Sequence, residues 1–192
     1  MPHLNSFYQD YRKLLRLYND GAIFTAFDTE TTGLSPSDNR ILEIGAIKFN
    51  KDGIIDNWNQ LFNPQCLIPQ FITNLTNISQ EMVTSCLTID NYLNDFISFT
   101  DNTVLIGHNA QFDLNFIYEE CLRTNCKYFS NKVIDTLRMS RWAYPTLGHW
   151  KLNYLAEKMN INPGNMHRAL DDAITCKEVF LHILDDTKSI QK

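Results

Sequence analysis

The sequence predicts an α/β fold in which a mixed five-stranded sheet is flanked by helices. Apolar runs of strand length come first along the chain, helical and strand patterns then alternate, and three helical patterns finish it. The length of 192 residues suits a single domain. A composition of 44% hydrophobic and 20% charged residues excludes disordered and fibrous proteins.

The first predicted element is an amphipathic helix over residues 7–18, where apolar side chains recur every three or four positions. We assign residues 1–21 to an N-terminal helical extension, residues 22–187 to the main domain and residues 188–192 to a polar tail. Short apolar runs bounded by turn residues predict the strands. The predicted strands are residues 22–27, 41–49, 58–62, 104–106 and 133–134.

Helical periodicity marks the remaining elements, and the segment 64–88 is expected to be mostly loop with short helical pieces. The further predicted helices are residues 89–99, 112–126, 136–144, 151–159 and 169–184. Strands followed by alternating helices and strands predict a sheet with helices on its faces. In such folds, ligand sites usually lie where strands end and helices begin.

The charge and the cysteine content indicate where the protein is located and which ligands it can bind. No apolar stretch is long enough to span a membrane, and five scattered cysteines without a C-x-x-C spacing favour a reducing, cytoplasmic location. A net charge of −5 is unusual for a nucleic-acid binder. Two divalent cations held by carboxylates would change it to −5 + 4 = −1 and place positive charge at the site itself.

Three short motifs carry the candidate chemistry. Residues 27–34 read FDTETTGL, so Asp28 and Glu30 lie two positions apart after an apolar run and point to the same side of the chain. Residues 106–113 read IGHNAQFD and put Asp113 in a first helical turn; residues 167–172 read HRALDD. Taken singly, each motif also fits a structural role, such as a helix cap or a solvated surface group.

Taken together, the motifs supply Asp28, Glu30, Asp113, Asp172 and His167 near strand ends and helix starts. Hard oxygen ligands without thiolates favour Mg²⁺ or Mn²⁺ over Zn²⁺. Two such ions about 3.5–4 Å apart can activate a water and stabilise a leaving oxygen in an attack on phosphorus. The sequence therefore predicts phosphodiester hydrolysis with two bound metal ions.

At this point the chain resembles the DnaQ-like 3′–5′ exonucleases of the Asp-Glu-Asp-Asp-His subclass, which have a ribonuclease H-like fold. The motifs occur in the family's order, and the resemblance covers about residues 22–187. The segments 41–46, 75–78 and 144–155 also resemble the branch related to the exonuclease domain of replicative polymerases. Asn77 stands where that branch usually has Gly, and Asn tolerates a left-handed backbone. The sister subclass has Tyr where this chain has Arg168, which indicates the His subclass.

The resemblance assigns a role to each site residue. Asp28 would bridge both ions, Glu30 and Asp172 would bind the ion that holds the attacking water, and Asp113 would serve the other ion. His167 would be the general base, because an imidazole changes its charge near neutral pH. Asp171 has no counterpart among the ligands, so we expect it to face solvent. The residues implied to contact the 3′-terminal nucleotide are Thr31, Leu34, His108, Asn109 and Phe112; for Leu34 and Phe112, core packing is the alternative.

The resemblance implies a 3′–5′ exonuclease that releases nucleoside 5′-monophosphates from DNA, with single-stranded 3′ ends as the first partner and a DNA polymerase as a second. Proofreading subunits of the family carry a further C-terminal segment, whereas here only a few polar residues follow the last predicted helix. An exoribonuclease of the same fold is an alternative, because the motifs do not discriminate the sugar. A non-catalytic binding module is a further alternative, although such a module is expected to have lost a ligand or the His.

Overall fold

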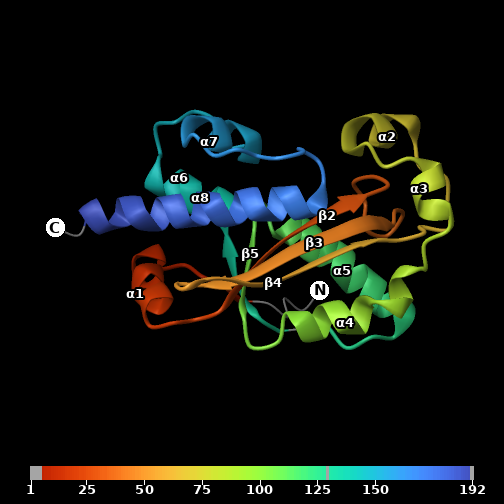
Figure 1. Ribbon diagram of the computed structural model, residues 1–192, viewed down its shortest axis with the longest axis horizontal. Coiled ribbons are helices and arrows are strands. Elements are labelled where there is room, and N and C mark those ends of the chain that lie inside the picture. The colour runs from red at the N-terminus through yellow and green to blue at the C-terminus, as the bar shows by residue number, and fades with distance from the viewer. Residues whose placement is uncertain (1–5, 129, 191–192) are drawn as a thin grey trace.

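A six-stranded sheet lies between two layers of helices (Figure 1). The computed structural model describes residues 6–128 and 130–190. The strands run, in spatial order, β1 (Ser6–Phe7), β6 (Lys132–Asp135), β5 (Val104–Gly107), β2 (Phe24–Thr31), β3 (Ile41–Asn50) and β4 (Gly53–Leu61). The pairs from β1 to β2 are parallel, whereas β3 is antiparallel to both β2 and β4. The predicted fold class, a mixed sheet flanked by helices, is confirmed.

The helices follow the predicted order. They are α1 (Leu14–Asn19), α2 (Gln70–Thr76), α3 (Gln80–Thr84), α4 (Leu93–Phe99), α5 (Gln111–Thr124), α6 (Thr136–Ala143), α7 (Leu152–Lys158) and α8 (Ala169–Ile190). Two 3₁₀ turns, η1 (Tyr11–Lys13) and η2 (Ile89–Asn91), precede α1 and α4. Asn77 ends α2 with a φ of 58°. This is the left-handed conformation that we expected Asn to tolerate at this position.

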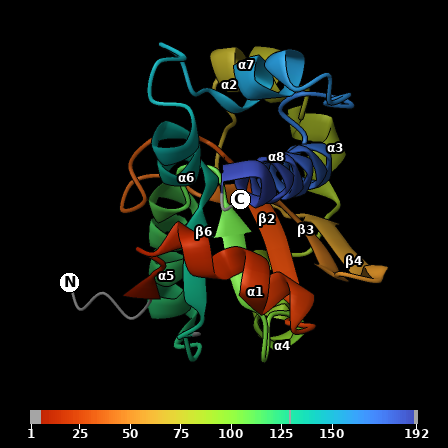
Figure 2. The same ribbon diagram turned by 90° about the vertical axis from the view of Figure 1, so that its left-hand side faces the viewer.

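Side-chain alternation along β2 separates the two cores. Phe24 and Ala26 face α8 and pack with Phe180, whereas Phe27 points to the opposite face and packs with Phe96 of α4. Figure 2 shows α8 and α5 on opposite sides of the sheet. The same alternation puts Asp28 and Glu30 on the face that α8 covers. The buried core of β2 thus directs two carboxylates toward the beginning of the last helix.

The N-terminal segment differs from its prediction as a single helix. Ser6 and Phe7 form β1 instead, which pairs with β6, and helical structure begins only at Tyr11. Local periodicity gives no signal for this pairing, because the partner lies more than a hundred residues away. The sheet therefore has one strand more than the predicted five.

Other boundaries also moved, and β4 begins at Gly53 rather than at residue 58. Strand β2 continues four residues beyond its predicted end at residue 27, because β3 pairs with it through Thr31. Helix α8 continues to Ile190, so residues 188–190 of the predicted polar tail are helical, while residues 191–192 lie outside the described residues. None of the helices in the described part of the chain is long and apolar enough to cross a membrane.

Candidate active site

The first motif lies at the end of the central strand β2. Asp28 is paired with Gly45 of β3, and Glu30 with Glu43. Glu30 is 8% exposed, whereas Asp28 keeps part of its surface open to solvent. Thr29, which points to the opposite side of the strand, donates hydrogen bonds from its backbone N–H and its hydroxyl to one oxygen of Asp113, at 3.0 and 2.6 Å. These bonds join the first motif to the second.

Asp113 belongs to the first turn of α5, directly after β5. The connection is tight, because Gly107 lies so close to Ala110 that a Cβ at position 107 would be 2.8 Å from the Ala110 methyl group. Asn109 adopts a φ of 64°, and its N–H donates to Asp135 at 3.1 Å. Asp135 also accepts from Leu137 N–H at the start of α6. This carboxylate, which the sequence analysis did not single out, therefore fixes both the second motif and α6.

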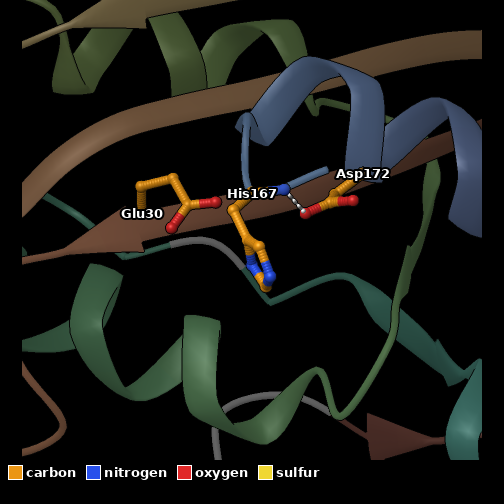
Figure 3. Close-up of side chains that lie close together, drawn as sticks. All are labelled: Glu30, His167 and Asp172. Atoms are coloured by element: carbon orange, nitrogen blue, oxygen red, sulfur yellow. Dashed lines mark hydrogen bonds between the residues drawn. The ribbon is translucent and has the colours of Figure 1, made fainter. Parts of the chain in front are cut away.

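The third motif begins in the loop before α8 and ends in the first turn of that helix. His167 has a φ of 60°, and its N–H donates to an Asp172 carboxylate oxygen at 3.0 Å. One side-chain ligand atom each from Glu30, His167 and Asp172 lies within 4.8 Å of the others. Figure 3 shows the three side chains converging from β2 and from the start of α8. The first and third motifs, which are more than a hundred residues apart in sequence, thus meet in space.

The carboxylates repel one another and are partly removed from water. Burial raises the pKa of Asp28 well above its ordinary value, and the charges of Asp113, Glu30 and Asp172 raise it further. Burial and the charge of Asp172 raise the pKa of Glu30 to about 8. Burial also raises the pKa of Asp113 to about 7, against the lowering effect of the Thr29 hydrogen bonds, and it raises the pKa of Asp172. Such a cluster has a strong capacity for cations.

We expect the metal-free protein to lose thermal stability as the pH rises. Because the folded-state pKa values of Asp28, Glu30 and Asp113 are raised, the folded state binds more protons than the unfolded chain between about pH 4 and 8. Stability is therefore highest below this interval and falls through it. The test is the melting temperature in EDTA at pH 5 and pH 8, repeated with Mg²⁺ or Mn²⁺, which should raise it most at pH 8.

Glu30→Gln should flatten this pH dependence, whereas Glu81→Gln, which changes an exposed carboxylate on α3, should leave it as in the parent. A parent melting temperature that does not fall between pH 5 and pH 8 would contradict the interpretation.

The beginning of α8 is held by a buried ion pair that the motifs did not reveal. Glu43 is 0% exposed and accepts from Arg168 Nε and Nη2 at 3.0 and 2.8 Å, and from Ala169 N–H at 3.1 Å. A methyl group at Gly45 would overlap the backbone of Ala169 and Leu170, so Gly45 lets α8 approach β3. A carboxylate and a Gly within the apolar strand at 41–49 were the available signals. These contacts position the segment that carries His167 and Asp172.

Arg168→Lys is expected to lower both stability and turnover. Lys cannot form the paired hydrogen bonds of a guanidinium, and a weakened charged hydrogen bond to a buried group costs about 1–3 kcal/mol. For a domain of this size, that is a fall in melting temperature of roughly 2–12 °C. The control is Arg16→Lys, whose exposed ion pair with Asp20 contributes little. Equal melting temperatures for the two variants would contradict the positioning role.

Asp171 is placed differently from its expectation. It does not face solvent freely but accepts hydrogen bonds from the backbone and side-chain nitrogens of Asn165, at 2.9 and 3.0 Å. Gly164 lies against the same carboxylate. Asp171 therefore anchors the loop that precedes His167. This role differs from that of Asp172, the next residue in the sequence, which belongs to the carboxylate cluster.

The residues predicted to contact substrate have different surroundings. Leu34 is 83% exposed, and Asn109 and the half-buried His108 line a cavity together with His167 and Asp172. The Thr31 hydroxyl donates to the Gly33 carbonyl at 2.7 Å. Phe112 is partly buried against Phe116, with ring centroids 5.0 Å apart. Leu34, His108 and Asn109 are thus open to a ligand, whereas Thr31 and Phe112 also serve the fold.

Comparisons with known proteins agree with this geometry. A family model described as "Exonuclease" (RNase_T) matches residues 25–180. The chain is 41% identical over 157 residues to a DNA polymerase III of PolC type from Clostridium perfringens, covering 82% of this chain but only 11% of that protein. It is 38% identical over 159 residues to DNA polymerase III subunit epsilon from Treponema pallidum, covering 82% of this chain and 74% of that one.

Solved structures share the fold. A structure of exonuclease I aligns with a TM-score of 0.74 at 18% identity, covering 86% of this chain and 41% of that one. A 3′-exonuclease that recognises the 3′ end of a histone mRNA stem-loop aligns with a TM-score of 0.76 at 22% identity, covering 86% and 64%. These likenesses show that the chain shares the fold of both exonucleases.

Proposed function

The chain belongs to the RNase_T exonuclease family, and on that premise we propose that it hydrolyses phosphodiester bonds at the 3′ end of DNA, releasing nucleoside 5′-monophosphates. The observation that carries the proposal is the meeting of Glu30, His167 and Asp172 within 4.8 Å, close to the partly exposed carboxylate of Asp28 and the buried carboxylate of Asp113. DNA is the favoured substrate because the relatives that show the family are named DNA polymerases.

The donor set fits two Mg²⁺ or Mn²⁺ ions. Asp28, Glu30, Asp113 and Asp172 offer oxygen ligands, and the pKa values of these carboxyl groups are raised first by burial and then by the charges of neighbouring carboxylates, both of which a bound cation would offset. Such ions, when bound, supply Lewis-acid activation of a water and charge stabilisation at the leaving oxygen. Asp28 is proposed to hold both ions, with Glu30 and Asp172 on the water side and Asp113 on the other.

His167 is proposed to take the proton of the attacking water on its imidazole. The water oxygen then bonds to phosphorus, and the bond to the 3′ oxygen of the preceding nucleotide breaks. The departing 3′ oxygen takes up a proton from solvent, so the products are a nucleoside 5′-monophosphate and a strand with a new 3′ hydroxyl, and the imidazole returns the proton of the water to solvent. His167 is exposed at the cavity, and its backbone N–H is fixed by Asp172, so its ring can face the reacting phosphate.

The test compares substrates under Mg²⁺. Single-stranded DNA, duplex DNA with mismatched 3′ ends and RNA, all labelled, are offered in parallel, with a 3′-phosphate-blocked DNA strand as the control. We expect stepwise shortening of DNA from its 3′ end, and little cutting of the blocked strand. Internal fragments, or undiminished cutting of the blocked end, would overturn the exonuclease proposal.

The same panel decides between the alternatives. Faster trimming of RNA than of DNA would assign the chain to RNA instead. A protein that binds strands but cuts none would be a non-catalytic module. That reading has little support, because all four carboxylates and the His are present.

Polymerase partnership and location belong to the same proposal. One relative is by its name a polymerase subunit, so we propose that this chain also acts beside a DNA polymerase, which co-elution of the two proteins would test. All five cysteines are free thiols, which supports the proposed cytoplasmic location.

A further inference from the structure

A cavity of about 690 Å³ leads from His167 and Asp172 to a basic surface on α6 and the start of α7. Figure 1 shows α7 and α2 on the same side of the molecule, to either side of the start of α8. We call the part of the cavity formed by Arg141, Trp150 and Lys151 the basic wall. The volume lies within the roughly 300–1,000 Å³ of sites that hold ligands of drug size. The cavity therefore accepts more than metal ions alone.

The two cations of the basic wall have no carboxylate partner among the described residues. Arg168, Arg123 and Arg138, by contrast, are each paired with a buried carboxylate. Arg141 and Lys151 are exposed, and Asp172 is the one carboxylate among the described residues that line the cavity. In a chain of net charge −5, two unpaired cations thus lie in the cavity that ends at the catalytic cluster. A phosphate there would meet uncompensated positive charge.

The contacts of Arg141 and Trp150 place the basic wall on α6 and on the loop that follows it. The indole N–H of Trp150 donates to the Tyr144 carbonyl at 3.1 Å, and the guanidinium of Arg141 lies 5.6 Å from the Trp150 ring centroid. His108, in the second motif, is hydrogen-bonded to the Thr136 hydroxyl at the start of α6, at 3.0 Å. The loop that carries Trp150 is therefore tied to the end of α6, and the start of α6 is tied to the second motif.

Helix α6, which carries Arg141, shares an anchor with the catalytic site. Asp135 accepts from Leu137 N–H in the first turn of α6 and from Asn109 N–H in the loop before Asp113. A preorganised surface loses less freedom when a ligand binds. The spacing between the basic wall and the carboxylates is thus set by the fold rather than by mobile side chains alone.

We propose that Arg141 and Lys151 bind the backbone phosphates on the 5′ side of the scissile bond, and that Trp150 contacts the adjoining sugar or base. The proposal rests on the proposed exonuclease function. The scissile phosphate would be bound by the carboxylates and their ions. Leu34, which is expected to contact the 3′-terminal nucleotide, lies on a different loop, after β2. The remaining strand leaves through the cavity, where only the basic wall offers unpaired cations among the described lining residues.

The test measures cleavage of single-stranded DNA of two to eight nucleotides by Arg141→Gln, Lys151→Gln and the double variant, at 50 and 200 mM salt. We expect each variant to lose about 3–10-fold in kcat/KM, mainly through KM, with a loss that grows from dinucleotide to tetranucleotide. Counterion release from a single strand changes the salt slope by about 0.7 for each phosphate contact, so the double variant should lose about 1.4.

Matched variants separate a contact from a general effect. Arg141→Lys keeps the charge and should retain the salt slope. Lys158→Gln, which removes a cation on the same α7 but outside the cavity, should behave like the parent. A double variant with the parent's slope and length dependence would overturn the proposal, as would an equal loss in Lys158→Gln.

Binding is measured separately so that the two proposals can fail independently. Fluorescence anisotropy of a labelled eight-nucleotide thymidine strand with Ca²⁺ reports affinity without requiring turnover. If the parent binds the strand through Arg141 and Lys151 but hydrolyses nothing, the exonuclease proposal is wrong, whereas strand binding by the basic wall is supported. If the parent cuts and the double variant binds and cuts equally well, the basic wall fails alone.

Discussion

Asp28→Ala is expected to abolish measurable hydrolysis while the protein remains folded. Asp28 is close enough to Asp113, Glu30 and Asp172 for their charges to raise its pKa, and it is the residue proposed to hold both ions. A site that cannot bind the ions lacks several kcal/mol of transition-state stabilisation, and at roughly 1.36 kcal/mol per factor of ten this is a loss of about 10³-fold or more. The measurement is the rate of nucleotide release from single-stranded DNA under saturating Mg²⁺.

Stability should move in the opposite direction from activity. Burial and acidic neighbours oppose the ionisation of Asp28, so Asp28→Ala or the isosteric Asp28→Asn removes this unfavourable charge from the metal-free site. The melting temperature in EDTA should be unchanged or higher than in the parent, and it should respond less to Mg²⁺ or Mn²⁺. Asp52→Asn, in the exposed turn between β3 and β4, is the matched control. Parent-like activity in Asp28→Asn would remove Asp28 from the proposed site.

His167→Ala is expected to lower kcat by about 10²–10⁴-fold, the usual contribution of a positioned general base. His167→Asn is the sharper variant. His167 has a φ of 60°, and Asn tolerates this left-handed backbone better than Ala, so the Asp172 cap is more easily kept. Metal affinity should change little in either variant, because the carboxylates remain.

The pH profile distinguishes a base from a structural residue. The parent rate should rise with pH as the base loses its proton, and this rise should be lost in His167→Asn. His182→Asn, on the same α8 and paired with Asp186 near the protein surface, should retain the parent profile. If His167→Asn kept the parent's pH dependence, another group would be the base.

The sequence by itself determined the fold class and the family. Both rest on local patterns, because period-two and period-3.6 spacings report which side of an element is buried. The motifs could also be recognised from local sequence. Asp28 and Glu30 share one face of a strand, and Asp113, His167 and Asp172 lie at or just before helix starts. Each local segment therefore carried its own signal, and the order of the three segments identified the family.

Only the tertiary structure decided what holds these segments together. Glu43 and Arg168 are 125 positions apart, and the sequence around either residue does not indicate that the two are paired. The same is true of β1 on β6, and of the continuation of β2 to Thr31 through its pairing with β3. Arg141, Trp150 and Lys151 become one surface because Asp135 and His108 hold the start of α6 beside the second motif, and Trp150 is hydrogen-bonded to the end of the same helix. Long-range pairing leaves no periodicity in the chain, so these contacts could be found only by folding it.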